Sequence, residues 1–514
     1  MAVTILSGSL YGLQANTVRV EVDVRRGLRS FTIVGLPDKA VEEAKERVTA
    51  ALHNSGLQSP SKLPRRIVVN LAPASVKKIG AGFDLPIAIG FLHAIEPFQC
   101  DLSATCFFGE LSLHGDVKEV RGALPLVLHA HEQGITTCFI PQDNISEVEM
   151  ARVSGLHIYG VRSLAELVSD MRRNRVEQRN DAVAKRETRK IGDKASYEHL
   201  FEHIHGQEFA KRGAEIAAAG FHNLLLFGPP GCGKTMLAHT MPSILPALRR
   251  DELVEVVRIY SAAGDCTEDI VRGRRPFRAP HHSSSDVSIL GGGAMIRPGE
   301  ITLAHKGVLF LDELAEFKSN VLEALRQPLE ERRIRIARAN GTFEFLADAL
   351  LVAATNPCPC GFRGDPEKEC RCTPALLSKY QRKLSGPLLD RIDISISMRR
   401  IAYKEFEQTL QTCDSSEVIR ARVTRVHEIQ QKRFGSELRF NAAMRPSEIR
   451  RFCVVGTNVR RLLQKAVKKY GLSPRGYYKV LKVARTIADL DNREHVALNH
   501  VAEALHYRQS TLMQ

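Results

Sequence analysis

The 514-residue sequence has no hydrophobic run that approaches the ~20 apolar residues of a membrane span. Its opening, MAVTILSGSLYG, also lacks the charged region and the long apolar core of a secretion signal. The eleven cysteines have scattered spacing and do not form the framework of a small disulfide-rich secreted domain. We therefore expect a cytoplasmic protein with free thiols and no membrane partner.

Acidic residues are in deficit, since 58 Asp and Glu stand against 73 Lys and Arg, a formal net charge of +15. This excess favours solubility and also a polyanionic partner, and composition alone leaves both interpretations open. The apolar content of 44% is ordinary for a folded protein. A chain of this length exceeds a single core, so about three domains are expected.

Composition separates four regions along the chain. Residues 1–170 alternate short β-rich stretches with helical segments, and residues 171–194 form a basic linker with almost no large apolar side chains. The linker charges serve either solvation or a nucleic-acid contact. Residues 195–397 alternate strands and helices, the pattern of a parallel sheet covered on both faces, and residues 398–514 are helical. The predicted fold class is α/β with an all-helical C-terminal lid.

The segment GPPGCGKT has the features of a phosphate-binding loop. It follows the apolar run 224–227, which is long enough for a buried strand, and it precedes a predicted helix. Glycines let backbone N–H groups converge on phosphate oxygens at the positive end of that helix. A chance Gly/Pro turn is the alternative, but it would not explain strand, Lys-Thr pair and helix together. The residues predicted to bind ATP are Gly228, Pro229, Pro230, Gly231, Cys232, Gly233, Lys234 (outer phosphates) and Thr235 (also Mg²⁺).

Two carboxylates, Asp312 and Glu313, end a second apolar run in the segment GVLFLDELAEF. Asp312 would hold Mg²⁺ through water, and Glu313 would act as the general base of hydrolysis. Each residue alone is also common as a helix N-cap. Asn356 follows a third apolar run, 350–354, where it either orients the attacking water or forms an ordinary Asn-Pro turn. Together with the phosphate-binding loop, the pattern predicts ATP hydrolysis.

A β-hairpin is predicted at residues 332–345, RRIRIARANGTFEF, because the segment alternates with period two around Asn340-Gly341. The alternation places its basic side chains on or near one exposed edge or tip, namely Arg333, Arg335 and Arg338. These charges either contact a ligand or only solvate an edge strand.

The segment 274–307 precedes the apolar run that ends in Asp312 and Glu313, and it is rich in Gly and His, so we expect it to be loop-like. Its pair His281-His282 is a weak metal signal, since adjacent histidines usually point in different directions. We interpret both histidines as loop or pore residues.

Four cysteines gather in the Gly/Pro-rich segment 356–373, namely Cys358, Cys360, Cys370 and Cys372. The C-x-C…C-x-C arrangement favours a closed site of four thiolates, for which Zn²⁺ is the suited metal. Its role would be structural, pinning an insertion in the ATPase core. Free thiols or a redox-labile disulfide are the alternatives.

These motifs together resemble the AAA+ superfamily in its magnesium-chelatase-like branch. Through the upstream segment HIHGQEFAKRGAEI, the resemblance implies that Ile204, Gly206 and Gln207 line the adenine pocket. LLDRID resembles the segment that carries the family's arginine finger, which implies Arg391. SPRGYYKV implies Arg475 as a second sensor that touches the γ-phosphate from the lid. By residue type alone, surface ion pairs are commoner for both arginines. A finger acts on the neighbouring subunit's nucleotide, so a ring is implied.

Essentially the whole chain resembles the YifB/ComM family, including the opening SGSLYGLQA, NLAPASVKKIGAGFDLPIAIG and the cysteine segment. The resemblance implies a hexameric, ATP- and Mg²⁺-dependent DNA helicase that promotes branch migration during homologous recombination in natural transformation. Single-stranded or branched DNA and recombination proteins are the implied partners. In related ring ATPases, hairpins such as 332–345 project into the pore and move along DNA. The alternative is a magnesium-chelatase-like or protein-remodelling ATPase that does not act on DNA.

The first domain resembles the proteolytic domain of Lon, an α+β fold of the ribosomal S5 domain 2 type. FGELSLHGDVKEVRGALPLVLHAHEQGI resembles the segment that bears Lon's catalytic lysine, which would fall on Leu124. The nucleophile region between Lys77 and Gly90 contains no serine. Because a Ser–Lys dyad needs both groups, the resemblance implies a noncatalytic scaffold, similar to that of RadA, that binds DNA or sets the assembly of the ring.

Overall fold

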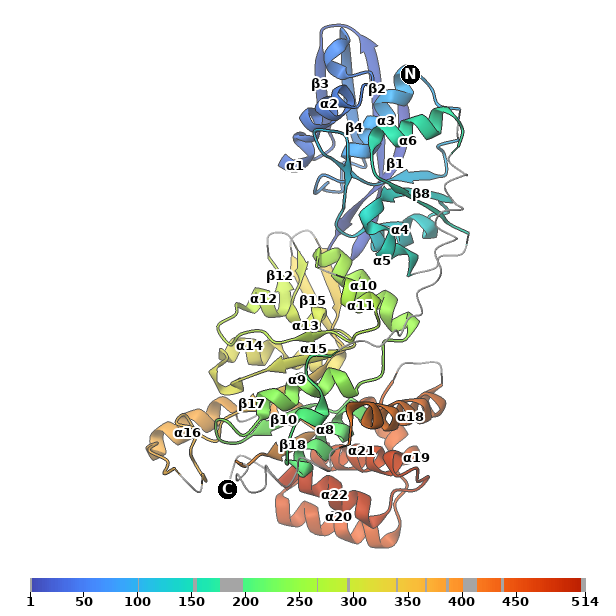
Figure 1. The fold of residues 1–514 in the computed structure, drawn as a ribbon. Coiled ribbons are helices and arrows are strands. Elements are labelled where there is room, and N and C mark those ends of the chain that lie inside the picture. The colour runs from blue at the N-terminus through green and yellow to red at the C-terminus, as the bar shows by residue number, and fades with distance from the viewer. Residues whose placement is uncertain are drawn as a thin grey trace. The chain divides into compact units, whose positions relative to one another are not determined.

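The structure is a computed structural model, and the parts of the chain that it describes form two compact units (Figure 1). Unit 1 combines Met1–Asp193 with Arg250–Arg272, and unit 2 combines Lys194–Arg249 with Gly273–Gln514. No helix among the described residues is long and apolar enough to cross a membrane. The described residues are 2–99, 101–150, 155–175, 197–265, 267–293, 296–338, 341–365, 368–384, 388–400, 414–435 and 439–509.

Most of the predicted basic linker, residues 176–194, lies outside the described part of the chain. Its first residues, 171–172, complete helix α6 (Leu164–Arg172). This helix starts at Ser163, whose hydroxyl accepts a hydrogen bond from the Glu166 N–H and caps the first turn.

Unit 1 is built on a seven-stranded sheet in the order β3-β4-β2-β1-β5-β8-β9. The long antiparallel pair of β1 and β2 lies at its centre, and β5, β8 and β9 extend it in parallel. Apolar side chains alternate along β2, so that one face is buried. The strands are β1 (Val3–Tyr11), β2 (Gln14–Arg26), β3 (Ser30–Val34), β4 (Arg65–Ala72), β5 (Thr105–Phe107), β8 (Thr137–Pro141) and β9 (His157–Val161).

Helices pack on this sheet, and α3 contributes the largest buried stretch, because it is apolar along most of its length. A small hairpin of β6 (Glu110–Leu111) and β7 (Val117–Lys118) completes the main elements of the unit. The other helices are α1 (Lys39–Glu42), α2 (Ala44–Asn54), α4 (Ala123–Glu132) and α5 (Ile145–Glu149), with α3 at Asp84–Ile95.

Unit 1 contains the two segments that resemble the catalytic regions of Lon. Leu124 is fully buried in α4, in keeping with a packing role. The region that corresponds to Lon's nucleophile contains a buried lysine, Lys78, which is 0% exposed. Its Nζ donates to the Pro73 carbonyl. Among the described residues, the hydrogen-bond partner recorded for this ammonium is thus a backbone carbonyl and not a serine hydroxyl.

Helices α10 (Arg250–Ala263) and α11 (Glu268–Val271) fall inside the range 195–397 expected for the ATPase core, yet they pack with unit 1. The Gly122 N–H donates to the Ser261 carbonyl at 3.0 Å, and an Arg258 Nη2 donates to the Leu13 carbonyl at 3.1 Å. Helix α10 buries an apolar stripe. The spacing of these residues predicts that the helix packs against the protein but not which element it packs against. The expected boundary therefore differs from the compact units.

Unit 2 contains a five-stranded sheet in the order β11-β14-β17-β10-β18, and every strand pair is parallel. The three central strands are almost wholly apolar and buried, as expected for a parallel sheet covered on both faces. The predicted mixed α/β fold is thus present. The strands are β10 (Leu224–Phe227), β11 (Phe277–Arg278), β14 (Val308–Leu311), β17 (Leu350–Thr355) and β18 (Ile394–Ser397).

The helices of unit 2 share one apolar core with this sheet. Helix α8 packs against α18 and α21, and α22 packs against β18, so the C-terminal helices join the ATPase core within one compact unit. The helices are α8 (Glu208–Gly220), α9 (Lys234–Ile244), α18 (Ser416–Phe434), α19 (Pro446–Phe452), α20 (Thr457–Tyr470), α21 (Pro474–Leu490) and α22 (Leu498–Gln509).

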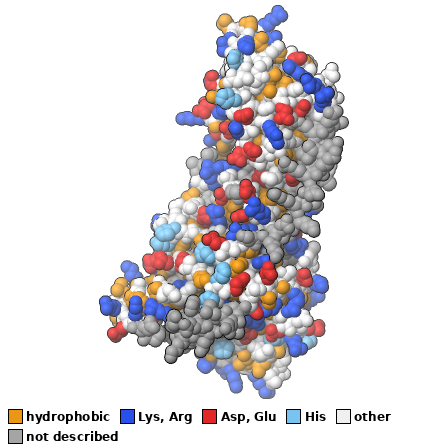
Figure 2. Space-filling model, in the orientation of Figure 1, with side chains coloured by type: hydrophobic (Ala, Val, Ile, Leu, Met, Phe, Trp, Pro, Cys, Tyr) orange, Lys and Arg blue, Asp and Glu red, His pale blue; other side chains and the backbone are white. Residues whose placement is uncertain are grey.

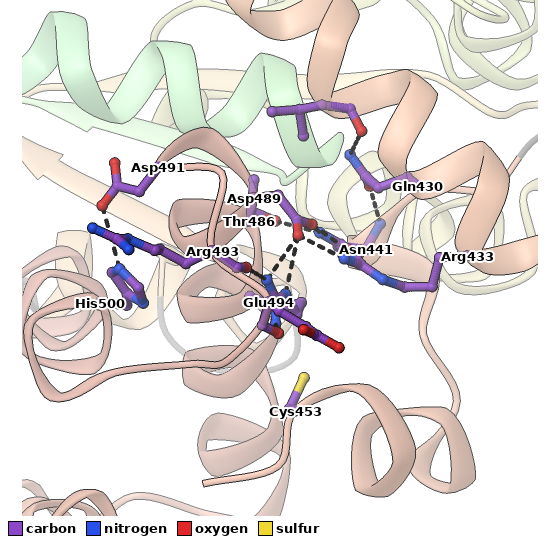
Figure 3. A network of polar contacts seen from close by, with 12 residues as sticks. Gln430, Arg433, Asn441, Cys453, Thr486, Asp489, Asp491, Arg493, Glu494 and His500 are labelled. Atoms are coloured by element: carbon purple, nitrogen blue, oxygen red, sulfur yellow. Dashed lines mark hydrogen bonds and ion pairs between the residues drawn. The ribbon is translucent and has the colours of Figure 1, made fainter.

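A buried polar network holds the C-terminal helices together (Figure 3). Asp489 on α21 accepts from Arg433 on α18 at 2.6 and 2.7 Å, and from Asn441 at 2.8 Å. Arg485, one turn earlier on α21, donates to the same carboxylate at 3.1 Å. Each buried charge is paired, as burial requires.

The predicted hairpin is present as β15 (Arg333–Arg338) and β16 (Gly341–Leu346), paired antiparallel from Arg333↔Leu346 to Arg338↔Gly341. Asn340 of the predicted turn lies outside the described residues. The base of the hairpin is anchored by Asp348, which pairs with Lys306 Nζ and Arg332 Nη1, both at 2.8 Å. Burial raises the pKa of Asp348, but Arg332 and Lys306 outweigh it and hold that pKa at about 2.

The expectation of a loop over residues 274–307 is wrong in part. This segment contains β11, α12 (Asp286–Leu290), the pair β12 (Gly291–Gly292) and β13 (Arg297–Pro298), and α13 (Glu300–Leu303). Ser285 caps α12 by accepting from the Ser288 N–H at 3.1 Å. These elements have two to five residues, too few to show a periodicity in sequence.

Candidate nucleotide-binding site

The phosphate-binding loop connects the carboxyl end of β10 to the first turn of α9. Gly231 and Gly233 have φ values of 78° and 92°, a left-handed conformation that favours glycine. At Gly228, an added Cβ would lie 2.3 Å from the Met398 carbonyl oxygen, so the backbone itself packs too closely for a side chain. The backbone N–H groups at this helix start can therefore converge on an anion.

Lys234 points back over the loop. Its Nζ donates to the carbonyls of Gly228 at 2.7 Å and Pro229 at 3.0 Å, and to Asn356 Oδ1 at 3.1 Å. The side chain is largely buried, and this desolvation lowers the pKa of the Lys234 ammonium. The structure thus brings Lys234 and Asn356, which are far apart in sequence, into direct contact.

Thr235 and Asp312 meet beside the loop, with Thr235 Oγ1 donating to Asp312 Oδ2 at 2.9 Å. Asp312 directly follows β14, and the Glu313 N–H donates to Asp312 Oδ1 at 2.9 Å. A hydroxyl and a carboxylate in contact are oxygen ligands of the kind that Mg²⁺ prefers. The donor set therefore fits a magnesium ion at this edge of the sheet.

Glu313 has a neighbour that the sequence did not indicate. Its backbone is left-handed, with φ 50°, and its Oε2 lies 3.4 Å from His282 Nδ1. The ring of His282 packs on that of His281, with centroids 4.1 Å apart. The adjacent histidines were interpreted as loop or pore residues, and no spacing rule connects them to a carboxylate thirty-odd positions later.

Gln207 lies next to the phosphate-binding loop. Its side chain Nε2 donates to the Cys232 carbonyl at 3.2 Å and to the Arg399 carbonyl at 2.6 Å, and its φ is 58°. Gly206 is also left-handed, with φ 62°, while Ile204 is 4% exposed within the core of the unit. The segment predicted to line the adenine pocket therefore contacts the loop through Gln207.

The four predicted metal ligands converge in space. All four sulfur atoms lie within 4.8 Å of one another. Cys358 Sγ lies 3.3 Å from Cys360 Sγ and 3.7 Å from Cys370 Sγ, and Cys360 Sγ lies 3.6 Å from Cys370 Sγ. Four thiolates bound to one tetrahedral Zn²⁺ at ~2.3 Å would be about 3.8 Å apart. The cluster of Cys358, Cys360, Cys370 and Cys372 therefore fits zinc in donor type and spacing.

This cysteine segment packs directly on the phosphate-binding loop. An added Cβ at Gly361 would lie 2.7 Å from Pro230 Cδ, which leaves no room for a side chain. Helix α16 (Pro374–Leu384) follows, and Tyr380 on it donates to the Asn356 carbonyl at 3.0 Å. The Nζ of Lys383 donates to the Ala315 carbonyl, next to the carboxylate motif, at 3.1 Å.

The two predicted phosphate-sensing arginines lie away from the phosphate-binding loop of their own chain. Arg391 ends the short helix η6 (Leu389–Arg391) just before β18, and its carbonyl accepts from Asn223, the residue before β10, at 3.0 Å. Since β10 and β18 are parallel, Arg391 lies at the amino edge of the sheet. The phosphate-binding loop lies at the carboxyl edge.

Arg475 lies with Arg391. The two arginines contact the same oxygen of Glu330, with Arg391 Nη2 at 2.5 Å and Arg475 Nη1 at 3.8 Å from Oε1. Both line a cavity of about 470 Å³ together with Tyr478 and Lys479. The structure therefore groups these arginines with each other and with a carboxylate.

The hairpin arginines share one exposed face. Arg333 and Arg335 both pair with Glu344 on the facing strand, at 2.5 and 3.1 Å, while Ile334 and Phe345 are buried on the other face. Arg333, Arg335 and Arg338 are all exposed, and Glu344 neutralises part of the charge of the first two. On the face drawn in Figure 2, basic and acidic side chains are intermixed and do not gather in one large patch.

Comparisons with known proteins cover almost the whole chain. Family models described as "Magnesium chelatase, subunit ChlI", "Subunit ChlI of Mg-chelatase" and "Magnesium chelatase, subunit ChlI C-terminal" match residues 200–406, 20–144 and 413–508. Part of the chain is also 25% identical over 151 residues to the Lon protease of Haemophilus influenzae, covering 29% of the chain and 18% of that protein. This similarity agrees with the predicted Lon-like region.

Full-length relatives share this organisation. The chain is 40% identical over 505 residues to the competence protein ComM of Haemophilus influenzae, covering 98% of the chain and 97% of the relative. It is 39% identical over 503 residues to the uncharacterized protein YifB of Escherichia coli, covering 97% and 95%. It is also 39% identical over 508 residues to the uncharacterized protein Rv2897c of Mycobacterium tuberculosis, covering 98% of each. The chain therefore belongs to the YifB/ComM family of magnesium-chelatase-related AAA+ ATPases.

Proposed function

We propose that this chain is an ATP-driven DNA motor that works as a homo-hexameric ring and promotes branch migration of DNA in homologous recombination during natural transformation. Three findings support the proposal. A relative over the full length is a competence protein, the nucleotide site has its complement of residues, and unit 2 carries an exposed arginine hairpin. Recombination proteins acting on the same DNA are further partners in this proposal.

The observation that carries the ring is the separation of the charged groups across the sheet. The strand β10 has four residues, which at ~3.3 Å per residue separate its two edges by about 13 Å. Arg391 and Arg475 at the amino edge cannot reach the phosphate-binding loop at the carboxyl edge of the same chain. A ring in which these edges of neighbouring subunits meet would bring both arginines to the neighbour's γ-phosphate.

In this proposal the residues around Lys234 carry hydrolysis. ATP supplies the phosphoryl group and Mg²⁺ neutralises charge on its oxygens. Lys234 contacts the outer phosphates, Thr235 and Asp312 hold the metal ion, and Glu313 takes a proton from the attacking water. Asn356 orients that water, since its amide already lies beside Lys234. Ile204, Gly206 and Gln207 would position the adenine.

Glu330 has a defined place in this mechanism. Its carboxylate oxygen contacts both arginines in the single chain. A γ-phosphate presented by the adjacent subunit offers the same guanidinium groups a stronger, multiply charged partner. Assembly with ATP would therefore exchange an internal ion pair for one across the interface.

The cysteine cluster is proposed to hold one structural Zn²⁺. Four sulfur ligands with no open position are typical of a structural and not a hydrolytic zinc site. Because Gly361 packs on Pro230, the metal would hold this segment against the phosphate-binding loop. The hairpin residues Arg333, Arg335 and Arg338 are proposed to contact the DNA backbone in the pore.

A magnesium-chelatase-like or protein-remodelling ATPase is the second candidate function. It is favoured by the match to family models described as magnesium chelatase subunit ChlI. It would use the same nucleotide site. The two candidates differ in whether DNA changes the rate of ATP hydrolysis.

Replacing Arg333 and Arg335 with Ala tests the DNA motor. The wild-type ATPase rate should rise several-fold with single-stranded or branched DNA, and the rise should fade as salt increases, because phosphate contacts release counterions. The double variant should keep its basal rate and lose most of the stimulation. Arg326→Ala/Lys318→Ala, which removes equal charge elsewhere in unit 2, serves as control. Wild-type turnover that is independent of DNA, without DNA binding at moderate salt, would contradict the motor.

Two substitutions separate ATP binding from hydrolysis. Lys234→Ala should abolish ATP binding or hydrolysis, because it removes the charge that faces the phosphates. Glu313→Gln should retain ATP but reduce turnover by about 10²- to 10⁴-fold, because it removes only the general base. Nucleotide binding by equilibrium dialysis and phosphate release measure the two effects. Near-normal turnover of Glu313→Gln would remove that residue from the base role.

Mixed rings test whether Arg391 acts across the interface. Lys234→Ala and Arg391→Ala subunits should each be inactive alone. In a mixture, some interfaces combine an intact loop with an intact finger, so partial ATPase activity should return under conditions where subunits exchange. Mass spectrometry of the assemblies verifies mixing. If demonstrably mixed rings stay inactive, Arg391 works within its own subunit or only in packing.

The zinc proposal is tested by metal analysis of protein purified under reducing conditions without chelator. About one Zn²⁺ per chain is expected. Cys370→Ser/Cys372→Ser should lose the metal and lower ATPase activity, since the segment that packs on Pro230 would loosen although no phosphate contact is altered. Cys453→Ser, which changes a buried cysteine outside the cluster, is the matched control. Wild-type protein without zinc would show that these cysteines are plain thiols.

A further inference from the structure

Strands β2 and β4 lie side by side in unit 1 (Figure 1). The last residues of β2 and the first residues of β4 are rich in arginine. The antiparallel register sets Arg25 directly opposite Arg66, and Arg26 directly opposite Arg65. Arg29 follows in the connection from β2 to β3. We refer to Arg25, Arg26, Arg29, Arg65 and Arg66 as the arginine end.

This pairing is unfavourable for the isolated fold. Like charges directly opposite each other in an antiparallel pair destabilise it. The register elsewhere provides complementary partners, since Glu344 faces Arg335 in the hairpin and Glu21 accepts from the facing Asn70 at 2.8 Å. At the arginine end, the ion pair that the structure records among the described residues is that of Arg25 with Asp23, at 2.6 Å. Within the described residues, most of the positive charge of the arginine end is therefore not paired with a recorded carboxylate.

The arginine end is also accessible. Arg25, Arg26, Arg29 and Arg66 are exposed, and Arg65 is half-buried. Arg25 and Arg66 project from the face opposite the buried Val22 and Ile67, because successive side chains of a strand alternate between faces. On the neighbouring β3, Thr32 and Val34 are exposed on this same face. A large ligand can therefore approach it.

We propose that the arginine end binds the phosphate backbone of DNA and gives unit 1 a contact of its own, separate from the hairpin of unit 2. The choice of DNA among polyanions rests on the proposed function. The guanidinium fork binds phosphate oxygens in a bidentate manner, and a backbone phosphate relieves the repulsion between facing arginines. Because contacts to backbone phosphates carry no information about the bases, the proposed contact is independent of sequence.

The test compares two double variants of the full-length chain. Arg25→Ala/Arg66→Ala removes one facing pair. Lys118→Ala/Arg162→Ala is the control, since it removes the same charge from exposed positions elsewhere in unit 1. Lys118 lies on β7 of the small hairpin, and Arg162 directly follows β9, the strand at the other edge of the large sheet. Affinity for labelled single-stranded and duplex oligonucleotides is measured by fluorescence anisotropy over a salt series, together with basal ATPase activity and thermal unfolding.

Removal of the facing pair should weaken DNA binding several-fold near physiological salt. The slope of log affinity against log salt should become shallower by about 1.4 to 1.8, which is ~0.7 to 0.9 for each lost phosphate contact. The basal ATPase rate should not change. The melting temperature should stay the same or rise, because a repulsive pair has been removed, whereas a structural role for these arginines would lower it. The control variant should keep the wild-type slope.

A wild-type chain that binds DNA while Arg25→Ala/Arg66→Ala keeps the same slope and affinity would overturn this inference and leave the proposed function intact. A wild-type chain that binds no DNA at all would overturn both. Competition by polyglutamate as effective as that by DNA of equal charge would assign the arginine end to an acidic protein segment instead of DNA.

Discussion

The parallel pairing of β10 with β17 on one side and β18 on the other determines where each charged group of the candidate site lies. Parallel strands end at a common edge, so the phosphate-binding loop, the carboxylate motif and Asn356 meet there, although Asp312 lies 77 positions after Thr235 and Asn356 lies 122 positions after Lys234. The same pairing holds Arg391, just before β18, at the opposite edge. A register slip would disturb both edges at once, because the same strands position the phosphate-binding loop and Arg391.

The cysteine segment supports this arrangement at the phosphate-binding loop. The loop contains the buried Lys234, and burial of an ammonium group costs free energy unless hydrogen bonds compensate it. Gly361 packs on Pro230, and Tyr380 and Lys383 on α16 hold the residues after β17 and β14. The cysteine segment and α16 together therefore contact three parts of the site. The cysteine segment contains few apolar side chains, so a bound metal would order it where apolar packing alone would not.

The parts of this structure that the sequence predicted are those dominated by local patterns. The buried strands at 224–227 and 308–311 agree with β10 and β14, because a parallel strand covered on both faces requires a continuous apolar run. The hairpin followed from alternation around Asn-Gly. The pairing of Glu330 with Arg391 and Arg475, and that of His282 with Glu313, had no local signal, since these contacts join residues that only the tertiary fold brings together. The grouping of helix α10 with unit 1 had no local signal either, because an apolar stripe shows that a helix packs but not against which element.

The placement of α10 and α11 bears on how the two units can act together. Because residues 250–272 belong to unit 1, the chain passes between the units three times, at 193–194, 249–250 and 272–273. The second passage comes a few residues after α9, which begins at Lys234. The third passage leads into β11, which pairs with β14, the strand before the carboxylate motif. A movement of either element would therefore be passed through the covalent chain to unit 1. In the proposed motor, this connection would let one ATP site act on both the arginine end of unit 1 and the hairpin of unit 2.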